Sequence, residues 1–284
     1  MLWRGQRESG NVEDVRGMSG RGMALGGGGC GTLIIVILAL IFGVDPQQLL
    51  NMSPEQQQTA PAPQQRSTNQ QTDEMSKFVR VVLASTEDTW NDILPKQARV
   101  RYREPKLQIF TNRVNSACGR ATAATGPFYC PGDEKVYIDL AFYQELKTQF
   151  KAPGDFAQAY VIAHEIGHHL QTILGTSAKV DEAQARARNQ AEANKYSVAL
   201  ELQADCYAGV WGNYAQKKGL LESGDVEEGL RAAAAIGDDN IQNMSQGYVV
   251  PDSFTHGSSE QRVTWFKRGF QSGDMRQCNT FGTR

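Results

Sequence analysis

Three of the four histidines in this 284-residue chain lie within six consecutive positions, at 164, 168 and 169. His164 and His168 are four residues apart, so on a helix they share one face and present both imidazoles to one point. Glu165 lies beside them, and H-E-x-x-H on a helix is typical of a zinc site whose glutamate takes a proton from a water molecule on the metal. The flanking residues are apolar or small, as expected of a buried site. We therefore predict one Zn²⁺ held by His164 and His168, with Glu165 as catalytic base.

A catalytic zinc usually has three protein ligands, so the third must come from another segment. His169 points about 100° away from His168 on the same helix, and we expect it at the helix surface or in support of a ligand. A later helical segment carries Glu201 and Asp205 four residues apart in a small, apolar stripe. Like charges at this spacing oppose helix formation, and buried carboxylates need partners. We expect Glu201 to be the third ligand and Asp205 to accept a hydrogen bond from a ligand imidazole; the alternative is a solvated pair.

His256 is the remaining histidine, and it lies in a loop that enters the last predicted helix. A lone loop histidine is most often exposed to solvent. Beside a zinc site it could instead donate a hydrogen bond to the oxyanion of a tetrahedral intermediate. Both interpretations stay open on the residues alone.

The elements that must position these residues follow from hydrophobic periodicity and capping patterns. Helices are predicted at 75–94, 155–174, 181–217, 225–244 and 258–270, the last with a capping box of Ser258 and Gln261. Short strands are predicted at 107–110 and 136–140, with an edge strand at 126–130 that an extended peptide could join. The predicted fold class is α+β: a mainly helical, zincin-like metalloprotease domain with a small sheet, spanning residues 75–284.

The first 74 residues differ in composition from the rest. Residues 1–22 are polar and rich in arginine, and we expect a cytoplasmic tail without a core. Residues 23–44 carry no charge and are long enough for one transmembrane helix, which would contact membrane lipid. A cleaved signal peptide is the alternative, but no small-x-small cleavage site follows. Residues 45–74 are rich in Gln and Pro and predict a flexible linker. Arginines before the span place the N-terminus in the cytoplasm and the domain outside.

Composition excludes several other classes of protein. The 29 Lys and Arg against 31 Asp and Glu give a net charge of −2, so nucleic acid is not an expected partner. The five cysteines form no C-x-x-C pair, which argues against a zinc ribbon. In an oxidising compartment Cys118 could pair with Cys130, and Cys206 with Cys278. The alternative for Cys206 is a small buried residue.

With these residues in hand, the chain resembles a bacterial family of neutral zinc metallopeptidases, single-span proteins of the inner membrane with a periplasmic catalytic domain. The resemblance is carried by Ser9–Asp14, the apolar segment, the Gln/Pro linker, Cys118–Cys130, His164–His168, Glu201–Asp205 and His256–Arg262. It is more distantly similar to CAAX-protease-type gluzincins, in which a Thr-His-Pro segment precedes the last helix; here Gly257 replaces the proline. The resemblance implies a peptide or protein substrate and a role for His256 as transition-state donor.

Two other functions remain compatible with these residues. One is a zinc-stabilised binding or scaffold module without catalysis, and the other is an amide hydrolase that acts on the cell-wall polymer. Glu165 favours catalysis over a scaffold, because a structural zinc site does not need a neighbouring base.

Overall fold

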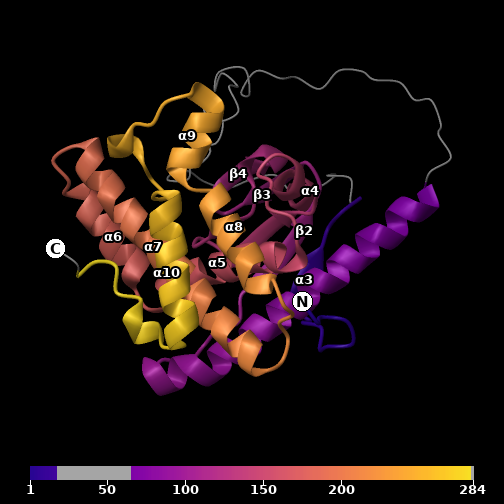
Figure 1. Ribbon diagram of the computed structural model, residues 1–284. Helices are drawn as coiled ribbons and strands as arrows, with labels where there is room; N and C mark the ends of the chain where they lie inside the picture. The colour runs from indigo at the N-terminus through magenta and orange to yellow at the C-terminus, as the bar shows by residue number, and fades with distance from the viewer. Residues whose placement is uncertain (18–64, 283–284) are drawn as a thin grey trace.

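A computed structural model describes the backbone of residues 1–17 and 65–282, and the side chains of 1–17 and 73–282. The architecture is mainly helical with a small sheet, which confirms the α+β prediction (Figure 1). No helix within the described ranges is long and apolar enough to cross a membrane. The expected span at 23–44 and most of the expected linker at 45–74 lie outside the described residues.

The helices form the larger part of the molecule, with α5, α7, α8 and α10 packed against one another (Figure 1). Their bounds are α3 Gln65–Gln97, α4 Ala141–Thr148, α5 Asp155–Ile173, α6 Thr176–Ala185, α7 Gln190–Lys217, α8 Asp225–Ala235, α9 Asp238–Gln246 and α10 Ser259–Ser272. Glycine allows α7 and α10 to touch through their backbones: a Cβ added at Gly269 would lie 1.9 Å from the carbonyl oxygen of Cys206. This close contact fixes the position of α7, which carries Glu201 and Asp205.

The sheet has the strand order β1-β2-β6-β5. The strands are β1 Val12–Asp14, β2 Lys106–Phe110, β6 Lys135–Asp139 and β5 Phe128–Cys130. β1 and β6 pair with β2 in parallel, whereas β5 is antiparallel to β6 and lies at the edge, as predicted. Strands β3 Arg113–Ser116 and β4 Gly119–Thr122 form a separate antiparallel hairpin.

Three predicted helix bounds are wrong, each for a local reason. Helix α3 begins ten residues before position 75. It also continues through Pro95, because a proline in the last turn removes few hydrogen bonds. The predicted helix 181–217 is two helices, since the side chain of Asn189 caps α7 by accepting a hydrogen bond from the Glu192 N–H at 2.9 Å. The predicted helix 225–244 is broken at Gly237, where an added Cβ would lie 2.4 Å from the backbone nitrogen of Ser259. The capping box of α10 is confirmed.

The expectation that residues 1–22 contribute no core is wrong for the part that is described, residues 1–17. Met1, Trp3 and Val12 are buried in the main core, and Trp3 contacts Phe78 edge to face at 5.5 Å. The Met1 ammonium lies 2.8 Å from the Asp155 carboxylate. Burial alone would lower the pKa of this ammonium, but the hydrogen bond with Asp155 helps raise it to about 10. The error arose because a three-residue strand and scattered apolar residues give no periodic pattern.

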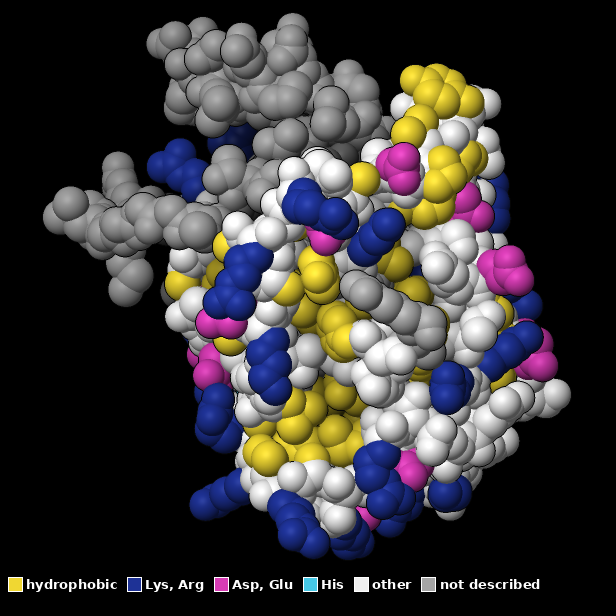
Figure 2. All heavy atoms as spheres, turned by 90° about the vertical axis from the view of Figure 1, so that its left-hand side faces the viewer, with side chains coloured by type: hydrophobic (Ala, Val, Ile, Leu, Met, Phe, Trp, Pro, Cys, Tyr) yellow, Lys and Arg dark blue, Asp and Glu magenta, His cyan; other side chains and the backbone are white. Residues whose placement is uncertain are grey.

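Both expected disulfides are formed, Cys118–Cys130 and Cys206–Cys278. The first ties the end of β5 to the β3–β4 hairpin, and the second ties α7 to the C-terminal segment. Exposed apolar side chains are concentrated at the end of α9 and just after it, at Met244 and Tyr248–Val250. Figure 2 shows hydrophobic side chains on a projecting upper corner of one face and in a band down the middle of that face, with charged side chains of both signs mainly around the margins.

Candidate metal centre

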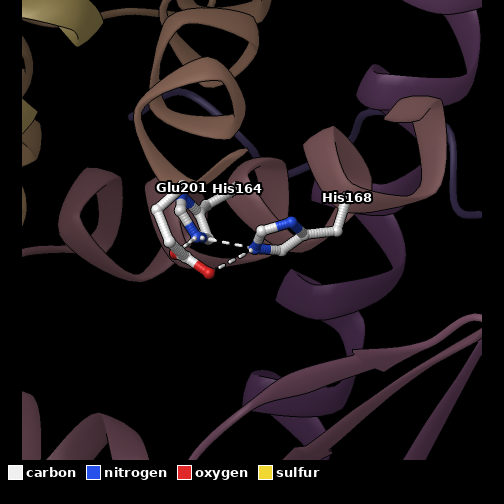
Figure 3. Close-up of side chains that lie close together, drawn as sticks. All are labelled: His164, His168 and Glu201. Carbon is white, nitrogen blue, oxygen red and sulfur yellow. Dashed lines mark hydrogen bonds and ion pairs between the residues drawn. The ribbon is translucent and has the colours of Figure 1, made fainter. Parts of the chain in front are cut away.

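Three predicted ligands converge on one point between α5 and α7 (Figure 3). The Nε2 atoms of His164 and His168 are 3.1 Å apart, and the Glu201 carboxylate oxygens lie 3.1 Å from the first and 3.4 Å from the second. A tetrahedral zinc with ligand bonds of about 2.0–2.1 Å would hold its ligand atoms about 3.3 Å apart. The arrangement therefore fits a zinc ion without rearrangement.

Gly167 explains how two helices can approach closely enough to build this centre. It lies between the two histidines on α5, and a Cβ added there would be 2.9 Å from Cα of Ala204 on α7. Ala204 is in turn one helical turn after Glu201. The small residues on both helices thus bring Glu201 to the histidine face.

The electrostatics of the three residues are those of a site for a cation. Although burial opposes it, Asp205 helps raise the pKa of His164 to about 10. Burial also opposes the shift at Glu201, yet the charge of His168 and the hydrogen bond with His164 hold the pKa of this carboxyl well below its usual range. The negative carboxylate of Glu201, together with the imidazoles of His164 and His168, thus favours a positive charge at the point where the three side chains meet.

Glu165 is a residue of α5 close to the edge strand β5. Its side chain is buried, and the backbone N–H of Tyr129 on β5 is close enough to favour its charged form. Burial raises its pKa above the ordinary value, while the nearby imidazoles of His164 and His168 oppose the shift. A buried carboxyl group beside a candidate metal centre has the environment of a proton acceptor.

Asp205 contacts His164, as expected, and is itself held by residues that the sequence did not single out. Its Oδ1 lies 2.8 Å from Nδ1 of His164, so the Nε2 atom of that ring faces the metal centre. Arg262 of α10 donates to both carboxylate oxygens, at 2.8 and 2.9 Å, and the Tyr160 hydroxyl donates to Oδ1. Burial opposes the shift, but the Arg262 charge lowers the pKa of Asp205.

His169 is fully buried, so the expectation of a surface position is wrong, although it does not point to the metal centre. Its Nε2 lies 2.6 Å from the backbone carbonyl oxygen of Arg103, and its Nδ1 lies 3.1 Å from the Tyr129 hydroxyl. Because a carbonyl only accepts, Nε2–H donates and Nδ1 accepts from Tyr129. Burial lowers the pKa of His169. Through Tyr129, this histidine fixes β5 against α5.

His256 is positioned by Asp238, which the sequence analysis missed. One Asp238 oxygen accepts from the backbone N–H groups of residues 255, 256 and 257, at 2.8, 2.6 and 2.9 Å. The other oxygen lies 3.2 Å from Nδ1 of His256, which leaves the Nε2 atom of that ring available. Burial opposes the shift, but Asp238 raises the pKa of His256, and Glu201 is close enough to contribute.

The glycine at position 257 has a structural reason. Gly257 has a φ of +92°, which the ring of proline cannot adopt. A Cβ there would also lie 3.2 Å from Leu202 and 3.3 Å from Val198, which flank Glu201 on α7. The loop of His256 therefore packs directly on the helix that carries the third candidate ligand.

The fold and the centre together define a mainly helical α+β protein with a histidine-histidine-glutamate site for a metal. A family model described as "putative neutral zinc metallopeptidase" matches residues 1–281, and the chain belongs to this family. The resemblance inferred from the sequence is thus confirmed.

Several curated proteins are similar to this chain. The uncharacterized protein YpfJ of Escherichia coli strain K12 is 52% identical over 99% of both chains, as is its counterpart in Escherichia coli O6:H1. An uncharacterized protein of Mycobacterium tuberculosis strain H37Rv is 40% identical over 86% of this chain and 85% of its own. No solved structure matches the chain.

Proposed function

We propose that the chain is a zinc-dependent metallopeptidase that hydrolyses peptide bonds. The observation that carries the proposal is the convergence of His164, His168 and Glu201 to within ligand spacing of one ion, with Glu165 buried beside them. Membership of the zinc metallopeptidase family supports it. His164, His168 and Glu201 would hold the single zinc ion.

Glu165 and His256 supply the proton transfer and charge stabilisation in this proposal. Zinc, when bound, polarises the scissile carbonyl and acidifies the attacking water. Glu165 accepts the proton of that water at its carboxylate and returns it to the leaving amine, for which its raised pKa is suited. His256 donates from Nε2 to the developing oxyanion, because Asp238 holds its Nδ1.

Strand β5 is the proposed docking edge for an extended peptide. It has β6 on one side and lies at the end of the strand order. The backbone N–H of Tyr129 on this strand lies near Glu165, so a peptide paired with β5 would lie beside the catalytic base.

We further propose that the domain works on the extracytoplasmic side of the bacterial inner membrane. Two disulfides support this location, because such bonds persist in oxidising compartments.

A cleavage assay with the full-length chain separates this proposal from its two alternatives. Casein and isolated peptidoglycan are offered in parallel to wild type, Glu165→Gln and Glu182→Gln. Glu182 is exposed on α6 and serves as control for the same chemical change. The proposal expects zinc in all three, casein cleavage by wild type and the control, and loss of cleavage in Glu165→Gln. Cleavage of peptidoglycan alone would favour the amide hydrolase, and zinc binding without any cleavage would favour the scaffold module.

A further inference from the structure

Gln171 is a fully buried amide, one helical turn after His168 on α5. Its Nε2 atom donates to the backbone carbonyl oxygen of Leu200 at 2.6 Å. Its Oε1 atom lies 2.9 Å from Nδ1 of His168. Leu200 directly precedes Glu201, so one side chain contacts a candidate ligand and the backbone beside another.

The Leu200 carbonyl determines which way this amide points. A carbonyl oxygen only accepts hydrogen bonds, so the atom that faces it must be the NH₂ group of Gln171. The same NH₂ group lies 3.3 Å from Oε1 of Gln203, whose own NH₂ group donates to the carbonyl of Cys278 at 2.9 Å. The backbone carbonyls of Leu200 and Cys278 therefore determine where the NH₂ group of each amide points, and so also where each Oε1 points.

The orientation of Gln171 in turn determines the proton position on His168. Because Oε1 faces Nδ1, the proton of the neutral ring lies on Nδ1 and the lone pair of Nε2 points to His164 and Glu201. Asp205 does the same for His164. The amide differs from Asp205 in adding no further negative charge beside Glu165 and Glu201.

We infer that Gln171 is a positioning residue of the metal centre: it holds His168 in the Nδ1–H tautomer and ties it to the helix segment that carries Glu201. The inference rests on the proposed zinc centre and deepens it. Partners of this kind around metal ligands typically change metal affinity by about 10–100-fold when they are removed.

The test measures zinc affinity of the full-length chain by competition with a chromogenic chelator. Gln171→Leu is compared with Gln184→Leu, because Gln184 also bridges to α7, donating to Ala193 and Ser197, without contacting the metal centre. Gln171→Leu is expected to bind zinc about 10–100-fold more weakly, and Gln184→Leu is expected to match wild type. Gln171→Glu keeps an acceptor for His168 but loses the donor to Leu200, so its zinc affinity should lie between those of wild type and the leucine variant.

A spectroscopic readout separates positioning from a general loss of stability. In the Co²⁺-substituted chain, proton NMR reports the exchangeable ring N–H of each ligand histidine. Gln171→Leu should speed the solvent exchange of the His168 ring N–H. The exchange of the His164 ring N–H should not change, because that group bonds Asp205, and it serves as an internal control. Equal zinc affinity in wild type and Gln171→Leu, or unchanged exchange at His168, would overturn the inference. Metal binding by wild type without peptide cleavage would refute the proposed function and leave this inference standing.

The N-terminal segment carries a second, independent inference. Glu87 of α3 is 2% exposed, and its described side-chain partners all come from residues 7–11. Ser9, Asn11 and Arg7 donate to it at 2.5, 2.9 and 3.0 Å. A buried carboxylate without such partners is strongly destabilising, so this segment stabilises the folded domain.

The backbone of the same segment is part of the sheet. Strand β1 pairs in parallel with β2, with Val12 opposite Leu107 and Asp14 opposite Ile109. Lys135 of β6 also contacts Glu13 at 2.7 Å. Residues 12–14 are thus an edge strand of the domain sheet.

We infer that residues 1–17 and 73–282 lie in the same compartment. A single membrane crossing between residues 17 and 65 would place them on opposite sides, which the β1–β2 pairing does not allow. The arginines that favoured a cytoplasmic N-terminus are in part neutralised within the fold: Arg7 pairs with Glu87 and Asp88, and Arg16 with Asp14. The two disulfides then indicate an extracytoplasmic location for both segments.

Cysteine labelling in Escherichia coli cells tests this arrangement. The full-length chain carries Cys30→Ser and one new cysteine, at exposed Glu8 or at exposed Lys179 of α6. A membrane-impermeant maleimide is applied to intact spheroplasts and to lysed cells. The inference expects the two positions to behave alike, both labelled in spheroplasts. Labelling of one position with protection of the other until lysis would overturn it.

Discussion

Asp205 and Arg262 form a two-point ion pair in the interior of the molecule, with N–O distances of 2.8 and 2.9 Å. The side chains are 0% and 2% exposed, and the pair lies directly behind His164. Removing one partner of such a pair leaves an uncompensated buried charge. We therefore expect Arg262→Met to lower the free energy of unfolding by about 3–5 kcal/mol, measured by urea denaturation.

The control for this variant is Lys267→Met on the same helix. Lys267 is exposed, so the same kind of change there should alter the free energy of unfolding by less than about 0.5 kcal/mol. Equal effects of the two substitutions would show that the ion pair has no special role. Arg262→Met should also weaken zinc binding, because Asp205 would no longer be held toward His164.

Removal of the metal gives a second prediction. Zinc that binds only the folded chain stabilises it by mass action, so a chelator should lower the melting temperature of the zinc-loaded protein. In Glu201→Ala the third ligand is lost, and the chelator should then have little effect. Calorimetry of both proteins with and without chelator measures this. A chelator shift of the same size in both would exclude Glu201 as a ligand.

The convergence of His164, His168 and Glu201 was predictable because the signals for it are local. Two pairs with a spacing of four residues, on segments of clear helical period, fix which side chains share a face. The apolar surroundings of Glu201 then indicate a buried partner. The structure brings these residues together as the spacing implied.

The supporting residues were not predictable in the same way. Asp238 precedes His256 by 18 residues, and its role depends on a loop that folds back over α9. Tyr129 contributes a backbone N–H, which no residue type reveals. Gln171 could have been found, since it lies one turn after His168 on the same face, but an amide at that position is also common on helix surfaces. Strand β1 is three residues long and too short to show alternation.

The low pKa of His169 gives a prediction on acid stability. Burial lowers the pKa of this side chain below its ordinary 6.5, so in the unfolded chain it takes up a proton at higher pH than in the folded one. The contribution of His169 to the free energy of unfolding should therefore fall as the pH drops below 6.5. His169→Gln removes this contribution, and urea denaturation at several pH values should show a weaker acid dependence than wild type. Parallel pH curves for the two proteins would contradict this.

The two disulfides should differ in their effect on stability because they close loops of different length. The cysteines are separated by 12 residues in Cys118–Cys130 and by 72 in Cys206–Cys278. Chain-entropy arguments give about 3 kcal/mol for the shorter loop and about 4 kcal/mol for the longer. Double alanine variants, compared by urea denaturation, should show this order.

The same double variants should also differ in which functional property they lose, kcat or zinc affinity. Cys130 ends β5, where the N–H of Tyr129 contacts Glu165, so loss of the shorter loop should lower kcat of peptide cleavage with little change in zinc affinity. Cys206 follows Asp205 on α7, so loss of the longer loop should mainly weaken zinc binding, because that helix carries Glu201. Parallel measurements of kcat and zinc affinity on both double variants test the distinction. Equal losses of both quantities in the two variants would show that the disulfides act only through global stability.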